Sequence, residues 1–307
     1  MDQGELMMDA ARALDPVRMP RRTALRAALA VGVALAGAGC ATSTPVAPSA
    51  GMAISKTPLI GKFVWRDLMT DDPALVKPFY AGLFGWEYEE RVAEGRPYTL
   101  VKSGGRFIGG IAKAERQAPG QPNAQWLSFM SVADVDQAQQ RTRDAGGKVL
   151  RPAFDVPKVG RAAIVLDPQG APLGLVRASF GDPADAPQPS LNSFLWTEAL
   201  VPDPRAAAQF YASLAGFEVI TEKDGARPYL VLRRGRDRAA IMHTPIKGMP
   251  PRWLVSVDVA DPAASAQRAK QLGGRILVAP HPDVRDGTVA LIADPTGALL
   301  ALQKWNH

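Results

Sequence analysis

The chain contains one stretch of sequence twice, and this repeat decides the fold. Residues 65–86 read WRDLMTDDPALVKPFYAGLFGW, and residues 196–217 read WTEALVPDPRAAAQFYASLAGF. In each stretch an Asp-Pro pair follows a strand-like segment and precedes an apolar helical stripe. Asp72 and Asp203 are therefore expected to cap helices that begin with proline. Gly85 and Gly216 are expected to end these helices in the left-handed conformation.

The repeat extends over most of the chain. Further matches recur in the same order: Arg96-Pro97-Tyr98 with Arg227-Pro228-Tyr229, Trp126-Leu127 with Trp253-Leu254, and Asp167-Pro168-Gln169-Gly170 with Asp294-Pro295-Thr296-Gly297. They define two tandem copies, residues 61–179 and 189–307, joined by a turn-rich linker over residues 180–188. Each copy reads as strand, helix and three strands, twice over. The sequence therefore predicts an α+β fold of two βαβββ modules per copy. Each copy is expected to have its own core, and the two are expected to pack as a monomeric pseudo-dimer.

The N-terminal part resembles an export signal. Residues 19–40 combine the arginines 21, 22 and 26, an uncharged run over 27–39, and Cys40 after small residues. This pattern predicts a lipoprotein signal over residues 1–40, with Met19 as a possible true start. Twin-arginine and general secretory export both fit, and a buried cytosolic helix is the alternative. An Ala/Ser/Thr/Pro-rich tether over residues 41–60 follows. We therefore expect an exported lipoprotein of the cell envelope or periplasm, anchored to the membrane through Cys40.

Composition excludes several function classes. The 307 residues have a formal net charge of +6 without a long basic run, so nucleic acid is not an expected partner. Cys40 is the single cysteine, which excludes an intrachain disulfide framework. No G-x-S-x-G motif occurs, so nucleophilic hydrolysis has no support.

The order of these motifs resembles the vicinal oxygen chelate superfamily, and more narrowly its tandem glyoxalase/bleomycin-resistance/dioxygenase-like proteins. The carrying pattern is FVW-x-D-L with D-P, F-Y-x-x-L-F-G-W-E, V-x-D-V-D and D-P-x-G, and it covers both copies. The resemblance implies βαβββ modules that pair into a cup-shaped mixed sheet. It also implies a cup that usually holds a divalent metal, and chemistry that includes isomerisation, ring cleavage and antibiotic binding.

The family's metal ligands do not carry over to this chain. Their positions fall on Trp65 or Arg66, Leu127 and Gly174 in the first copy, and on Trp196 or Thr197, Leu254 and Ala301 in the second. None of these residues is His, Asp or Glu, which divalent metals at such sites require. We therefore expect no metal ligands and no cofactor, and metal-dependent glyoxalase or dioxygenase activity is disfavoured.

Three polar residues are candidates for catalysis. Asp67 and Glu198 are equivalent acids on the first strand of each copy, and each could act as a general base or orient a substrate. The alternative is a strand-end acid paired with an arginine. His243 lies on a strand of the second copy, where a structural role is the alternative.

Five residues are candidates for binding. Arg66 could clamp a carboxylate or phosphate, or form a structural salt bridge. Tyr98, Trp126, Tyr229 and Trp253 could line a pocket for an aromatic ligand, with core packing as the alternative.

The sequence leaves the biochemical role open between hypotheses of different classes. The first is a protein that binds a small organic molecule in cups without the usual metal. The second is an active lyase, isomerase, oxygenase or hydroxylase with an atypical site. In the third, one copy only supports the other. The ligand itself cannot be read from the sequence.

Overall fold

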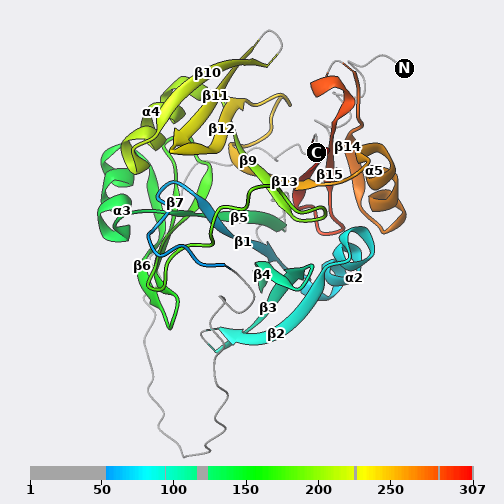
Figure 1. The fold of residues 1–307 in the computed structure, drawn as a ribbon, viewed down its shortest axis with the longest axis horizontal. Helices are drawn as coiled ribbons and strands as arrows, with labels where there is room; N and C mark the ends of the chain where they lie inside the picture. The colour runs from blue at the N-terminus through cyan, green and yellow to red at the C-terminus, as the bar shows by residue number, and fades with distance from the viewer. Residues whose placement is uncertain (1–52, 94, 116–123, 225–226, 283, 306–307) are drawn as a thin grey trace, which may run out of the picture.

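The computed structural model describes residues 53–93, 95–115, 124–224, 227–282 and 284–305. These residues form two eight-stranded mixed sheets, one from each copy (Figure 1). The predicted α+β fold is therefore confirmed. The predicted signal, Cys40 and most of the tether lie outside the described residues.

The first sheet joins the two modules of the first copy. Its strands are, in spatial order, β2 (Glu87–Ala93), β3 (Arg96–Ser103), β4 (Arg106–Lys113), β1 (Phe63–Thr70), β5 (Ala124–Ser131), β8 (Pro172–Ala178), β7 (Gly160–Leu166) and β6 (Lys148–Val156). The central pair, β1 and β5, is antiparallel, and each of its strands has a parallel neighbour on its other side, β4 or β8. The strands near the middle are therefore fixed on both edges.

The second sheet repeats this order with the strands of the second copy. They are β10 (Glu218–Asp224), β11 (Arg227–Arg234), β12 (Arg236–His243), β9 (Phe194–Val201), β13 (Arg252–Asp258), β16 (Leu299–Gln303), β15 (Val289–Ala293) and β14 (Arg275–Val278). β14 has only four residues, against nine in its counterpart β6, and a loop with the short 3₁₀ turn η1 (Arg285–Gly287) follows it. The two copies thus differ in the length of this strand and in the turn that follows it.

The described residues also form four α-helices: α2 (Pro73–Phe84), α3 (Val135–Asp144), α4 (Pro204–Ala215) and α5 (Pro262–Gln271). As predicted, Asp72 and Asp203 cap α2 and α4 through backbone N–H groups, and Gly85 and Gly216 end them with φ of 70° and 67°. Among the described residues no helix combines the length and the apolar character needed to cross a membrane.

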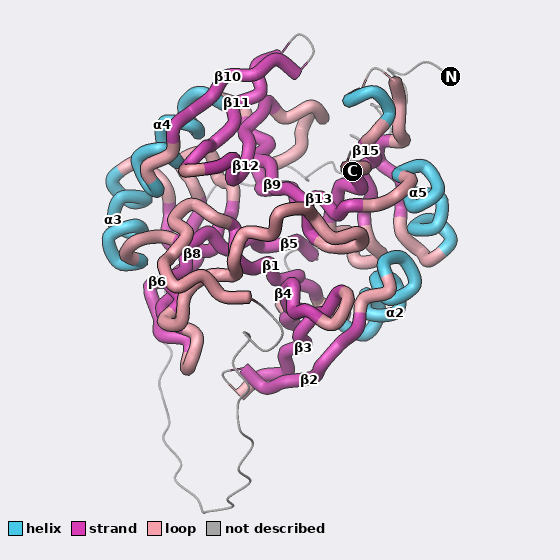
Figure 2. Tube along the Cα trace, viewed as in Figure 1, coloured by secondary structure: helices cyan, strands magenta, loops and turns pink. Residues whose placement is uncertain are grey.

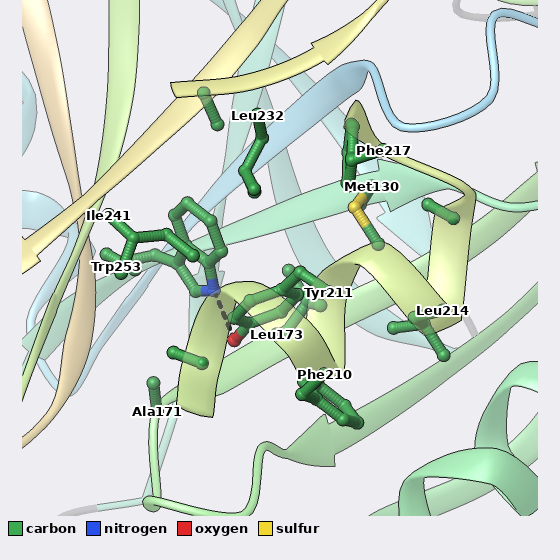
Figure 3. Close-up of a cluster of buried hydrophobic side chains, with 14 of the residues drawn as sticks. Met130, Ala171, Leu173, Phe210, Tyr211, Leu214, Phe217, Leu232, Ile241 and Trp253 are labelled. Carbon is green, nitrogen blue, oxygen red and sulfur yellow. Dashed lines mark hydrogen bonds between the residues drawn. The ribbon is translucent and has the colours of Figure 1, made fainter. Parts of the chain in front are cut away.

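The helices pair across the two copies, as Figure 2 shows: α2 lies beside α5, and α3 lies beside α4. Each pair sits on a hydrophobic core that both copies build. The α3–α4 core combines Met130 and Leu173 of the first copy with Tyr211 and Trp253 of the second (Figure 3). Two buried clusters therefore combine residues of both copies, while a third belongs to the second copy alone, so the expectation that each copy has its own core is met only in part. Each helix packs on strands of its own copy and also against the paired helix of the other copy.

Two buried hydrogen-bond chains connect the copies reciprocally. Trp126 Nε1 donates to the Tyr80 hydroxyl (3.0 Å), which donates to Asp294 in the Asp-Pro-x-Gly turn of the second copy (2.9 Å). In the mirrored chain, Trp253 donates to Tyr211 (2.9 Å), which donates to Asp167 in the equivalent turn of the first copy (2.8 Å).

The turn that forms the last hairpin of each copy thereby also binds the helix of the other copy. Asp167 Oδ1 accepts the backbone N–H groups of Gln169 and Ala171 inside its own turn, which leaves Oδ2 for the tyrosine. Because these side chains are buried, losing one of the hydrogen bonds would leave a polar group unpaired in the core, which costs free energy of folding.

Candidate functional site

In the first copy the side chains of Trp65 and Tyr98 lie beside the predicted acid Asp67. The Asp67 carboxylate accepts hydrogen bonds from the Tyr98 hydroxyl (2.7 Å) and from Trp65 Nε1 (2.8 Å). Trp65 Nε1 also lies 3.0 Å from the Tyr98 oxygen, so the three groups close a triangle. Successive residues of a strand point to opposite faces. Since Leu68 lies in the α2–α5 core, Asp67 lies on the face of the sheet opposite the helices, which we call the cup face.

A glycine makes this arrangement possible. Tyr98 lies on β3 and Asp67 on β1, and Gly110 of β4 lies between them, directly beside Asp67. A Cβ at Gly110 would lie 1.9 Å from the Tyr98 hydroxyl and 2.7 Å from Asp67 Oδ1. Any side chain at position 110 would therefore separate the tyrosine from the carboxylate.

The Asp67 carboxyl has an unusual protonation equilibrium. Burial raises its pKa to about 6, although the hydrogen bonds from Tyr98 and Trp65 oppose this change. Within the described part of the chain no basic side chain forms an ion pair with Asp67. The pKa of Tyr98 lies well above its ordinary value because of burial and the neighbouring carboxylate. Asp67 can thus exchange a proton near neutral pH, while Tyr98 remains a hydrogen-bond donor.

The second copy repeats the group with one addition. Tyr229 donates to Glu198 (2.5 Å) and Trp196 donates to Tyr229 (2.9 Å). Arg285 completes the group: its Nη2 lies 2.6 Å from Glu198 Oε1, and its guanidinium carbon lies 5.2 Å from the centre of the Tyr229 ring. The acid of the second copy is therefore neutralised inside the protein.

The cup face of the second copy is also filled by apolar side chains. Ile246 and Met249, from the loop after β12, are buried in a cluster with Leu200 and Leu254. Glu198 and Leu200 are only 4% and 2% exposed, whereas their equivalents Asp67 and Met69 in the first copy are partly exposed. Solvent therefore reaches the acid of the first copy more freely than that of the second.

Arg66 does not face a cup. It points to the opposite side of β1, where its Nη2 donates to Thr197 Oγ1 (2.9 Å) and its guanidinium lies 4.9 Å from the Phe194 ring centre. Burial between the two copies lowers its pKa to about 10. The prediction that Arg66 clamps an anionic ligand is therefore wrong, because strand alternation points it into the interface between the copies.

Trp126 and Trp253 are core residues. They are 4% and 3% exposed, and their indole N–H groups donate to Tyr80 and Tyr211. Their assignment to a ligand pocket is corrected: the alternative of core packing describes them.

His243 is separate from both acids. It is the last residue of β12, is exposed, and has Nδ1 2.9 Å from the Thr244 carbonyl oxygen. In the parallel β12–β9 register it pairs with Val201, while Glu198 pairs with Ala240. The structure does not bring His243 and Glu198 into one site.

Sequence reasoning missed Arg285. It lies 87 residues from Glu198, in the loop between β14 and β15, and no sequence motif predicts this contact. The Asp-Gly pair that follows it indicates a turn. In that turn Arg285 and Asp286 have φ of 48° and 52°, a left-handed conformation that is unfavourable for such residues.

The residues on the cup faces do not fit the metal that the family resemblance implies. Asp67 lies opposite Leu127 in the β1–β5 register, and Glu198 lies opposite Leu254 in the β9–β13 register. At Gly174 the position is blocked, since a Cβ there would lie 2.2 Å from the Phe129 ring. The described residues contain no group of three or more His, Cys, Asp or Glu side chains placed to bind a metal ion. One acid per cup cannot supply the usual donor set.

Two comparisons of sequence identify relatives. The family model of the Glyoxalase/Bleomycin resistance protein/Dioxygenase superfamily matches residues 60–175 and again residues 193–302. "Putative glyoxylase CFP32" of Mycobacterium bovis is 31% identical over 244 residues, covering 78% of this chain and 93% of that protein. "Anthracycline biosynthesis protein DauV" of Streptomyces sp. (strain C5) is 29% identical over 260 residues, covering 78% of this chain and 91% of that protein.

Solved structures show the same fold at low sequence identity. The Mn(II)-bound glyoxalase from Novosphingobium aromaticivorans is similar with a TM-score of 0.55 and 17% identity, covering 80% of this chain and 82% of that one. An extradiol ring-cleaving dioxygenase from B. fuscum is similar with a TM-score of 0.52 and 16% identity, covering 83% of this chain and 75% of that one. With both halves of the sequence matched by the family model, this chain belongs to the Glyoxalase/Bleomycin resistance protein/Dioxygenase superfamily.

Proposed function

We propose that this protein is an exported lipoprotein whose first copy binds a small organic molecule on its cup face without a metal. The observation that carries the proposal is the group of Trp65, Asp67 and Tyr98, which places a partly exposed, hydrogen-bonded carboxylate on the cup face. Binding sites for small molecules combine apolar walls with a few convergent polar groups in this way.

The second copy serves as a scaffold in this proposal. Its apolar cluster around Met249 and its internal ion pair between Glu198 and Arg285 leave the acid without exposed surface to offer a ligand. Its helices meanwhile complete both cores. Binding and support are thus divided between the copies.

A thermal-shift screen tests the proposal. The chain from Gly51 is melted with a library of small organic molecules, with and without divalent metals, and polycyclic aromatic compounds are included because of the name of the Streptomyces relative. A ligand present at 100 times its Kd raises the stability by about 2.7 kcal/mol. The expected hit raises the melting temperature without added metal, and Asp67→Asn abolishes the shift while Glu198→Gln retains it. Hits that require a metal, or that Asp67→Asn leaves unchanged, contradict the proposal.

Proton-transfer catalysis is a second candidate for the same site. It is favoured by the pKa of Asp67, raised to about 6, since a general base works best when its pKa lies near the working pH. In that case Asp67 removes a proton from the bound molecule and Tyr98 donates a hydrogen bond to the charge that develops. Solvent-deuterium incorporation into a hit compound, followed by NMR and lost in Asp67→Asn, distinguishes this enzyme from a binding protein.

Export forms a separate part of the proposal and has its own test. Mass analysis of the mature protein from a membrane fraction should identify an N-terminal Cys40 that carries acyl chains. Two or more chains anchor a protein stably, whereas a single one does so only marginally. A mature protein that begins elsewhere, or whose Cys40 is unmodified, contradicts lipid anchoring.

A further inference from the structure

The two cup faces carry the same polar group, and among the residues that the structure describes only the group of the second copy has a cation in contact with it. Trp65, Asp67 and Tyr98 correspond to Trp196, Glu198 and Tyr229, each pair 131 residues apart. In both groups the tyrosine hydroxyl donates to the acid and lies within 3.0 Å of the indole nitrogen. The two copies therefore present the same three kinds of side chain, and the second adds an occupant from its own chain.

In the second copy the occupant is the guanidinium of Arg285. It is bound by the carboxylate of Glu198 at 2.6 Å, lies 5.2 Å from the centre of the Tyr229 ring, and has Nη2 4.0 Å from Met242 Sδ. A carboxylate together with an aromatic face is a characteristic binding site for a planar organic cation. The chain adopts the left-handed conformation at Arg285 to place this side chain, with φ of 48°. Such strain persists only where surrounding contacts compensate for it.

In the first copy the corresponding basic residue points away. From Gly147 and Gly274 to the two Asp-Pro-x-Gly turns the copies align 127 residues apart, which makes Lys158 the equivalent of Arg285. Lys158 also has a left-handed φ, of 63°. It lies, however, at the tip of the β6–β7 hairpin, where it is exposed and borders a surface hollow with Asp155 and Arg177.

The difference follows from the lengths of the strands. β6 continues for nine residues and pairs with β7 as far as Val156, so the tip of the hairpin is held away from the sheet centre. β14 ends after four residues, and the chain then folds back through η1. Equivalent basic residues therefore have different roles: Arg285 lies in the cup of the second copy, and Lys158 lies outside the cup of the first.

We propose that the cup of the first copy binds a small organic molecule carrying a guanidinium, amidinium or ammonium group, which takes the place beside Asp67 that Arg285 takes beside Glu198. The inference rests on the proposed function and specifies the chemical class of its ligand. The apolar part of such a molecule would lie on the cup face beside Phe129, which is partly exposed and whose ring covers Gly174.

Charge and reach agree with this class of ligand. The side chains nearest to Asp67 on adjacent strands are Leu127 of β5 and, across Gly110 of β4, Tyr98 of β3, so Tyr98 is the titratable group in contact with it. Neither residue supplies a positive charge. Asp67 is one methylene shorter than Glu198, and the ligand must therefore approach the sheet more closely than Arg285 does. Gly110, where the second copy has Ala240, leaves the space in which the Tyr98 hydroxyl meets Asp67.

Isothermal titration calorimetry of the full chain in detergent tests the inference with matched probes. Phenylguanidine is the cation, phenylurea is its neutral isostere, and benzoate is the anion. At pH 7.5 we expect phenylguanidine to bind with one equivalent per chain and at least tenfold more tightly than phenylurea, with no binding of benzoate. Because the carboxyl must be ionised to bind a cation and has a pKa of about 6, the affinity should fall about tenfold between pH 7 and pH 5.

Variants assign the binding to one site. Asp67→Asn keeps the shape and should abolish the preference for phenylguanidine over phenylurea. Asp144→Asn makes the same chemical change on the exposed end of α3 and should leave the affinity unchanged. Arg285→Ala should create a second site of the same kind, so that two equivalents of phenylguanidine bind and the melting temperature lost with Arg285 is restored by the probe.

The outcomes separate this inference from the proposed function. Equal affinities for phenylguanidine and phenylurea, or a preference that survives Asp67→Asn, overturn the cationic ligand class. Binding of phenylguanidine by Arg285→Ala alone, and not by the wild-type chain, overturns it as well. The proposed function stands if neutral compounds from the wider screen bind in an Asp67-dependent way, and it fails if no compound does.

Discussion

Removing the Tyr80 hydroxyl tests the most specific contact between the two copies. Tyr80 is fully buried, donates to Asp294 and accepts from Trp126 Nε1. In Tyr80→Phe the carboxylate of Asp294 loses one donor and the indole N–H loses its acceptor. A hydrogen bond to a charged group contributes about 1.5–3 kcal/mol, and an unsatisfied buried donor costs about 1–3 kcal/mol. We therefore expect a loss of about 3–5 kcal/mol in the free energy of unfolding.

The assay is urea denaturation at pH 7, followed by circular dichroism. Tyr211→Phe should lose a similar amount, because it breaks the mirrored chain to Asp167. The matched control is Tyr88→Phe, whose partly buried hydroxyl donates to the Lys77 carbonyl at 2.7 Å, with an expected loss of about 1 kcal/mol.

The shape of the transition is as informative as its midpoint. Since both cores contain residues from both copies, each variant should shift a single transition without an intermediate. A loss in Tyr80→Phe no larger than that of Tyr88→Phe refutes the energetic role of the chain. Two separated transitions refute the shared cores.

Three further outcomes are expected. Phe79→Ala should destabilise the protein by about 3–5 kcal/mol in the same assay, since Phe79 is 2% exposed and packs against Gly274 of the other copy; a near-neutral change contradicts the packing. Asp67→Asn should raise the free energy of unfolding by about 1–3 kcal/mol at pH 8 and by clearly less at pH 4, as measured by urea denaturation at both pH values. The sign follows because a carboxyl whose pKa is raised to about 6 on folding loses its stabilising contribution as the pH rises through 6; an equal effect at both pH values contradicts the raised pKa. Elemental analysis after dialysis against Zn, Ni, Mn and Fe should find less than stoichiometric metal, whereas bound metal that disappears in His243→Ala restores the hypothesis of a metal enzyme.

Local elements could be predicted from the sequence because their causes are local. The Asp-Pro starts at Asp72 and Asp203 and the glycine stops at Gly85 and Gly216 lie within one turn of the helices they bound. Strand positions followed from alternation and from the repeat. The Asp-Pro-x-Gly turn could be read in the same way, and its first aspartate does hold the turn together.

Long-range partners could not be predicted, since a tandem repeat is compatible with two arrangements of the cores. Nothing in the spacing of Trp126 or Tyr80 tells whether a buried hydroxyl bonds to its own copy or to the other. Arg66 illustrates the same limit, because a shift of one residue along β1 decides between the cup and the interface. The pairing of Asp67 with Tyr98 follows from strand order, and the contact between Arg285 and Glu198 follows from the length of β14.

The shared cores also set the order in which the chain can fold. Part of the apolar side of α2 packs against the last module, where Phe79 approaches Gly274 and Tyr80 donates to Asp294, so the first module completes its packing only when the last module is present. Closing so long a loop delays folding, because contacts distant in sequence form late and slowly. A nascent chain therefore exposes this part of α2 until the last module has been synthesised. If the protein is exported as proposed, a chain threaded unfolded must complete this late packing after it crosses the membrane, and a chain exported folded must complete it before.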